Sequence, residues 1–110
     1  MENDRISRQK VKRVSIRRIT SKNEVIDIVE RVVKIGNVEM YESEVAKAYH
    51  ENKYVVSYVG VFQLDYSSAN KMYYGRKIID IRGIAKRGRF HLMNAETIND
   101  ILGKKVLAER

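Results

Sequence analysis

The side chains best suited to hold a ligand gather in one short basic stretch. Tyr74 precedes this stretch and Phe90 follows it directly. Asp80 is its only acid, against six cations: Arg76, Lys77, Arg82, Lys86, Arg87 and Arg89. Arginine holds phosphate with two parallel hydrogen bonds, and aromatic rings stack on bases. The combination favours a ligand with both phosphates and bases, which means a nucleotide or a nucleic acid.

A solvated basic hairpin accounts for the same residues without a ligand. In that alternative Phe90 enters the core, where phenylalanine is often found. His91 lies between Phe90 and Leu92, so it is either a partly buried strand residue or a further contact to phosphate. The sequence is compatible with both interpretations.

A strand, a turn, a second strand and a helix are predicted to position these side chains. Apolar residues at 78, 79, 81 and 84 favour a strand. Gly88 can take the positive φ of a hairpin turn, after which residues 90–93 form the return strand. Asn94 is a good N-cap for a helix that stops at Gly103 and has an apolar face at 95, 98, 101 and 102. The N–H groups that follow Asn94 can also receive an anion.

Patterns typical of catalysis are not found in the sequence. The chain has no cysteine, which excludes disulfides, thiolate catalysis and cysteine-ligated metals. It has no nucleophile-elbow serine, no H-E-x-x-H and no P-loop, and His50 and His91 are its only histidines. We predict a protein that is not an enzyme and needs neither a cofactor nor a metal.

The net charge of +8 and the pI of about 9.8 point to an anionic partner. Nucleic acid, nucleotides, anionic membrane and acidic proteins all satisfy this condition. No apolar run approaches the ~20 residues that span a bilayer, and no signal-peptide core follows Met1. We therefore expect a cytoplasmic protein without a membrane partner, in the host cytoplasm if a phage encodes it.

The chain is predicted to be a basic mobile arm over residues 1–9 and one domain over residues 10–110. β-branched residues among cations favour a strand from Lys10 to Ile19. Such a strand either faces phosphate or is an edge strand that its charges protect from aggregation.

The middle of the chain is harder to interpret. Residues 21–36 are the ambiguous segment. Their valines and isoleucines favour a strand that folds back at Gly36 into a strand over 38–41, although a helix capped at Ser21 is the alternative. Ser43 is predicted to cap a helix over 44–52. Residues 54–64 read as one strand that is apolar on both faces, with a bulge or close approach at Gly60. Residues 65–76 read as a loop.

These elements predict an α+β fold with about five strands in a small, mainly antiparallel sheet. Two or three short helices are expected on one face. Because so few helices leave apolar strand surface uncovered, we expect a homo-oligomer.

The segment VIDIVERVVKIGNVEMYESEVAKAYHENKYVVSYV resembles a small module of bacterial and phage proteins of unassigned function. In overall organisation the chain also resembles phage anti-defence sponges of the Thoeris anti-defence type. That resemblance covers most of the chain and includes no sharp motif. It implies capture, without cleavage, of cyclic nucleotide signals such as cyclic ADP-ribose derivatives between subunits. It assigns the stacking ring to Phe90, the ligand amide to Asn94 or Asn99, and the phosphate contacts to Arg82, Arg87 and Arg89.

Three functions follow as expectations. The first is an oligomeric sponge for cyclic nucleotide or ADP-ribose-derived signals, with Arg76, His91 and Tyr74 as further ligand contacts. The second is a small nucleic-acid-binding protein that holds the phosphate backbone. The third is a phage inhibitor that docks on an acidic protein partner.

Overall fold

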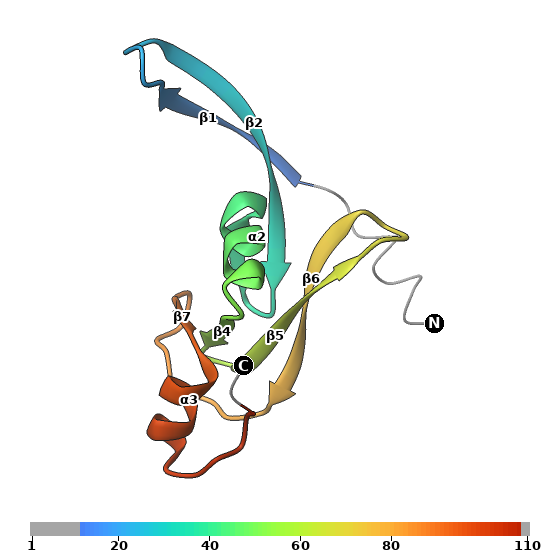
Figure 1. Ribbon diagram of the computed structural model, residues 1–110, viewed down its shortest axis with the longest axis vertical. Helices are drawn as coiled ribbons and strands as arrows, with labels where there is room; N and C mark the ends of the chain where they lie inside the picture. Colours follow the sequence, from blue (N-terminus) through green and yellow to red (C-terminus); the bar gives the residue numbers. More distant parts are fainter. Residues whose placement is uncertain (1–11, 109–110) are drawn as a thin grey trace.

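Two antiparallel sheets and two helices make up residues 12–108, which are the residues that the computed structural model describes (Figure 1). One sheet has the strand order β1-β2-β3 and the other β6-β5-β4-β7. The elements are β1 Lys12–Ile19, β2 Val25–Ile35, β3 Val38–Tyr41, α2 Glu42–His50, β4 Tyr54–Ser57, β5 Gly60–Ser67, β6 Met72–Ile79, β7 Phe90–Met93 and α3 Ala95–Leu102. The α+β class and the antiparallel pairing are confirmed, but the prediction of about five strands was too low. The arm predicted for residues 1–9 lies outside the described residues.

β2 and β3 form the hairpin predicted around Gly36, so the helical alternative for this segment is wrong. Gly36 has φ +60°, and the two strands pair from Val32 opposite Tyr41 to Ile35 opposite Val38. β-branched side chains lose rotamer freedom in a helix and pack well on a pleated sheet. This local preference decided the outcome.

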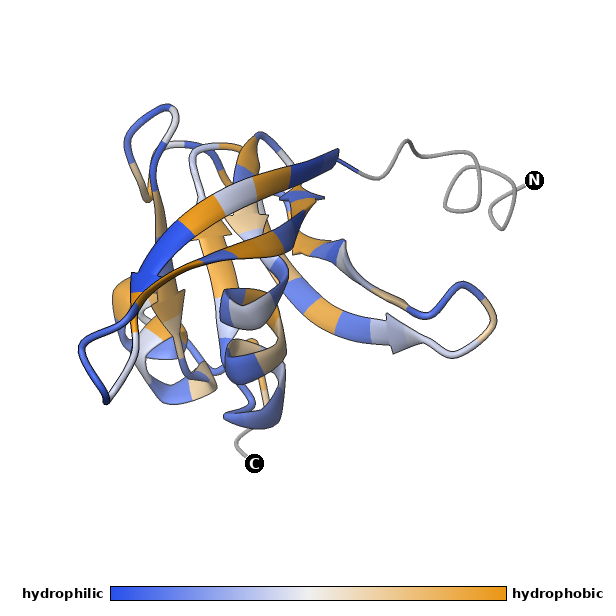
Figure 2. Ribbon diagram, turned by 90° about the horizontal axis from the view of Figure 1, so that it is seen from above, coloured by the Kyte–Doolittle hydropathy of each residue, from blue (hydrophilic) through white to orange (hydrophobic). Residues whose placement is uncertain are grey.

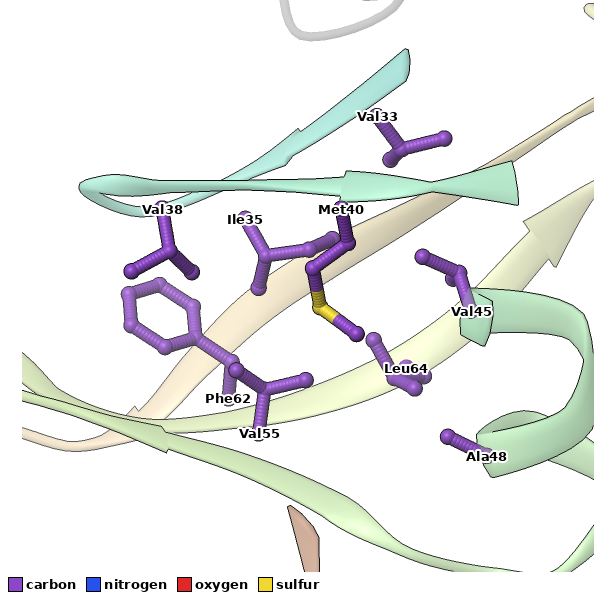
Figure 3. Close-up of a cluster of buried hydrophobic side chains, with 9 residues drawn as sticks. All are labelled: Val33, Ile35, Val38, Met40, Val45, Ala48, Val55, Phe62 and Leu64. Carbon is purple, nitrogen blue, oxygen red and sulfur yellow. The ribbon is translucent and has the colours of Figure 1, made fainter. Parts of the chain in front are cut away.

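The main core lies between this hairpin, α2 and one face of the four-stranded sheet (Figure 3). Ile35 is fully buried at its centre. The cluster consists of Val33, Ile35, Val38, Met40, Val45, Ala48, Val55, Phe62 and Leu64. A second cluster on the opposite face joins Tyr54, Val56 and Val61 to Ala95 and Ile98 of α3. The two helices therefore cover opposite faces of the sheet. The prediction that they lie on one face is wrong.

Both helices begin at residues with extended backbone, but only one N-cap was predicted correctly. Asn94 caps α3 by accepting a 2.9 Å hydrogen bond from the Thr97 N–H. Gly103 ends that helix at φ +71°, also as predicted, although Ile101 is half-exposed and not on the buried face. α2 begins one residue before Ser43, and the Tyr41 N–H donates to the Glu44 carboxylate at 3.0 Å.

Residues 54–64 form two strands and not one. β4 and β5 are joined by a turn at Tyr58 and Val59, where the Ser57 hydroxyl accepts a hydrogen bond from the Val59 N–H. Tyrosine and valine are not typical turn residues, which is why the sequence pattern concealed the turn. The close approach predicted at Gly60 is confirmed, because a Cβ there would lie 2.5 Å from the Ile79 carbonyl oxygen.

Two further predictions about hairpins are wrong. The segment 65–76, predicted as a loop, is mostly paired as the β5–β6 hairpin, from Leu64 opposite Gly75 to Ser67 opposite Met72. The expected hairpin between residues 78–84 and 90–93 does not form, because β6 and β7 occupy opposite edges of the sheet. β7 pairs with β4, so residues 80–89 cross the end of the sheet to reach it.

Gly75 offers a test of how the two sheets interlock. A Cβ at this position would lie 2.6 Å from Ile35 Cγ2, so Gly75→Ala forces β2 and β6 apart. We expect the free energy of unfolding to fall by about 1–3 kcal/mol, as for other overpacked cores, when measured by denaturant titration. In an Ile35→Ala background the same substitution should lower the free energy of unfolding much less, since the clashing Ile35 atoms are gone. Equal costs in both backgrounds would contradict this account.

Candidate functional site

Residues 80–89 connect β6 to β7 and pass over the β4–β5 turn. We call this segment the basic crossover. The Gly83 N–H donates to the Tyr58 carbonyl at 2.9 Å, and the Arg89 N–H donates to the Lys86 carbonyl at 3.0 Å. Gly88, at φ +77°, supplies the left-handed backbone of this last turn, as predicted. Ala85 is buried and anchors the middle of the segment. The crossover is thus irregular in backbone but held to the β4–β5 turn by the Gly83 hydrogen bond and by the burial of Ala85.

Positive charge on the crossover is not neutralised locally. Its only acid, Asp80, is paired with Lys77 at 3.4 Å. No ion pair between residues 12–108 includes any of its four exposed cations, which are Arg82, Lys86, Arg87 and Arg89. Like charges that are close together and lack counterions attract an anion strongly.

One aromatic ring belongs to this site although the sequence did not single it out. The Arg87 guanidinium lies over the Tyr58 ring, 4.9 Å from its centroid. A cation–π contact of this kind contributes about 0.5–1 kcal/mol at an exposed site and holds the guanidinium in one place. Tyr58 was missed because it was assigned to the interior of a long strand. A tyrosine followed by a β-branched residue and Gly60 was the only available signal of the turn.

Phe90 and His91 begin β7 at the end of the crossover, but they lie on opposite faces of the sheet. Phe90 is half-buried and packs against the main core, together with Leu92. His91 is exposed, on the face that α3 partly covers. Phe90 therefore takes the core position that the sequence left open as an alternative. A single ligand cannot contact the faces of both rings at once, because strand side chains alternate.

Asn94 and Asn99 are both engaged in local structure. Asn94 lies beyond Met93, which pairs with Tyr54, so the start of α3 is separated from the crossover by the length of β7. The Asn99 amide is buried and makes three hydrogen bonds: its Nδ2 donates to the Leu107 carbonyl, and its Oδ1 accepts from the N–H groups of Val106 and Leu107, all within 2.9 Å. Asn99 thereby fastens the C-terminal segment to α3.

Tyr74 and Arg76 lie along β6 and not on the crossover. The Tyr74 hydroxyl donates to the Asp65 carboxylate at 3.3 Å, and Arg76 donates to the Gln63 side chain at 3.3 Å. Burial and the neighbouring Asp65 charge raise the pKa of Tyr74, because both disfavour the phenolate. Gln63 also lines a groove of about 190 Å³ below the end of α2, beside His50 and Lys53.

The predicted site residues therefore divide into two groups. The structure brings Arg82, Arg87, Arg89 and Phe90 to one end of the four-stranded sheet. Tyr74 and Arg76 lie elsewhere because β6 and β7 are not neighbours, and Asn94 and Asn99 because they lie beyond the far end of β7. His91 is near the crossover but on the opposite face of the sheet from Phe90. No helix among residues 12–108 has the length and apolarity to cross a bilayer, and the same residues contain no cluster of three potential His, Cys, Asp or Glu metal ligands.

Comparison with known proteins gives no match: no protein-family model, no curated protein and no solved structure is significantly similar to this chain.

The structural role of Asn99 can be tested separately from ligand binding. Asn99→Ala leaves two backbone N–H groups without their acceptor, which should lower the free energy of unfolding by about 1–3 kcal/mol. Thermal or denaturant unfolding measures this loss. Asp100→Ala, at the exposed neighbouring position, is the matched control and should be close to neutral. An Asn99→Ala variant as stable as the parent chain would show that these hydrogen bonds do not hold the C-terminal segment.

Proposed function

We propose that the protein is a non-enzymatic binder that sequesters phosphate-bearing cyclic nucleotides, with the basic crossover as its phosphate-binding element. The observation that carries the proposal is the set of four exposed cations that form no ion pair among residues 12–108, one of which, Arg87, lies over the Tyr58 ring. Phosphate would take the place of the missing counterions. Sequestration requires tight binding and abundant protein, and no chemical step.

The geometry supports a division of roles within this site. Arg87 and Arg89 flank Gly88 at the tight turn, so their guanidinium groups suit neighbouring phosphate oxygens. Arg82 lies beside Gly83, which is hydrogen-bonded to the β4–β5 turn, and adds a third cation from the other side of the crossover. Tyr58 is the aromatic candidate for contact with the base, because Phe90 packs against the main core and Tyr58 belongs to neither core cluster.

The remaining predicted contacts require a second subunit. Tyr74, Arg76, His91 and Asn94 are too dispersed in one chain to meet a compact ligand that sits on the crossover. In a homo-oligomer, residues of one chain can lie against the crossover of another and enclose the ligand. We therefore propose that the binding protein is oligomeric and that its site is completed between subunits.

The test is calorimetric titration with cyclic ADP-ribose isomers and cyclic dinucleotides at low and high salt. We expect at least one of these ligands to bind at both salt concentrations and to be recovered intact after the protein is heat-denatured. Recovery of a cleaved ligand would contradict sequestration. Failure of all of them to bind would contradict the proposed ligand class.

Substitution of the two turn arginines tests the site itself. An Arg87→Ala, Arg89→Ala double variant should bind the ligand at least tenfold more weakly, since each charged hydrogen bond contributes about 1.5–3 kcal/mol. Lys34→Ala, an exposed cation on β2, is the matched control and should bind as the parent does. Undiminished affinity in the double variant would place the site elsewhere.

Nucleic-acid binding is a second candidate because of the charge on β1. Arg13 and Arg18 are exposed, and no ion pair among the described residues includes them. A two-stranded β-ribbon is narrow enough for the major groove of DNA. This function predicts binding to duplex or single-stranded oligonucleotides with an affinity that falls steeply as salt is added. On logarithmic axes, affinity should fall linearly with salt concentration, with a slope close to the number of phosphates neutralised. Oligonucleotide binding that is insensitive to salt would contradict the nucleic-acid function. Capture of an acidic protein from nuclease-treated lysate would favour the third function, an inhibitor that docks on an acidic protein.

A further inference from the structure

Among residues 12–108, no strand lies beside the outer half of the β1–β2 hairpin on either edge. Both strands extend away from the rest of the molecule (Figure 1), and β3 pairs with β2 only from Val32 to Ile35. Where β2 leaves β3, its edge is flanked by the start of α2: Glu30 accepts a hydrogen bond from the Ser43 N–H, and Arg31 forms an ion pair with Glu42. Among the described residues, the open edge of β2 is therefore the stretch 25–29.

Apolar residues occur along both strands of this hairpin, as the hydropathy colouring of the ribbon shows (Figure 2), and they lie on both of its faces. Because direct cross-strand partners share a face, Ile19, Val25 and Val29 lie on one side, where they are 70%, 61% and 67% exposed. Ile16 and Ile28 are directly paired on the other side, beside Ile26, which is 40% exposed. An isolated two-stranded hairpin is marginal in water, and exposed apolar patches of this kind mark protein interfaces.

Charge decides which edge can join to a second copy of this chain. A two-fold pairing of β1 centred on Ser15 would place Arg13 opposite Arg17 of the second copy and Lys12 opposite Arg18, because direct partners share a face. Like charges directly opposite destabilise a sheet. The open edge of β2 contains one charged residue, Asp27, whose carboxylate lies 3.8 Å from the Arg17 guanidinium of the same hairpin. β2 is thus the edge able to pair with itself. The basic β1 then lies outermost, where charged edge strands prevent further addition.

We propose that β2 pairs antiparallel with β2 of a second copy, across a two-fold axis at Asp27. Asp27 is the midpoint of the open stretch, so this register uses all of residues 25–29 and avoids the start of α2. Val25 then lies opposite Val29 of the second copy, and Ile26 opposite Ile28. The product is a continuous sheet in the order β1-β2-β2-β1, with the exposed apolar side chains of both chains adjacent on each face. At the axis, two Asp27 carboxylates and two Arg17 guanidinium groups balance one another.

This interface goes beyond the proposed nucleotide capture and does not depend on it. Its tests measure mass and cross-linking without any nucleotide, so failure of the interface and failure of nucleotide binding are distinguishable. The parent chain should sediment as a dimer or as a multiple of dimers. A monomer at all concentrations would overturn the proposal.

Cysteine cross-linking tests the register directly, because the chain has no cysteine of its own. Directly opposed residues in antiparallel strands have Cα atoms about 4.5–5.5 Å apart, within the range that a disulfide spans. Asp27→Cys should therefore form a disulfide-linked dimer under mild oxidation, which a reductant reverses. Ser15→Cys is the matched control, exposed on the same face of β1, and should remain monomeric on a denaturing gel. Cross-linking of Asp27→Cys no greater than that of Ser15→Cys would overturn the proposal even if the parent chain is a dimer.

A charge pair tests the same register without a covalent bond. Val29→Lys should weaken the dimer, because it places a lysine opposite a valine of the second copy. Adding Val25→Glu should restore the dimer, since each lysine then lies opposite a glutamate across the axis, and high salt should reduce that rescue. Circular dichroism of each variant confirms that it is folded. A double variant that dissociates as readily as Val29→Lys alone would contradict the pairing of Val25 with Val29.

Discussion

Close contact between β2 and β6 is the constraint on which the two-sheet arrangement depends. Ile35 is fully buried and occupies the space that a side chain at Gly75 would fill, and Gly36 lies in the same way against the Phe62 ring. Because both positions are glycines, the β2–β3 hairpin can pack closely against the four-stranded sheet. α2 then closes one side of the same core (Figure 3). Without this close approach, the core side chains of the two sheets could not interdigitate.

The crossing at the end of the four-stranded sheet follows from its strand order. Because β7 pairs with β4 and not with β6, the chain must pass over the β4–β5 turn between residues 80 and 89. That path brings the Arg87 guanidinium over the Tyr58 ring. Local sequence made the segment basic, and the topology made it a surface with one aromatic ring and no acidic partner among the described residues.

The β1–β2 hairpin has a different balance of forces. Near β3 it is part of the core, whereas its outer half exposes apolar side chains on both faces. Its cations are concentrated on one strand, which is why the proposed self-association uses β2 and not β1. The two proposals, anion binding and self-association, thus concern separate parts of the chain.

The sequence by itself determined the local features of this protein. β-branching made residues 25–35 a strand, Gly36 made the turn, and Asn94 and Gly103 bounded α3, because each depends on the conformational preference of one residue or its near neighbours. The composition of the basic stretch was equally visible. Only the tertiary structure decided that residues 54–64 divide at Tyr58, that β7 pairs with β4, and that Asn99 is committed to the C-terminal segment. Those outcomes depend on pairing and burial between residues distant in the sequence, to which hydrophobic periodicity is insensitive.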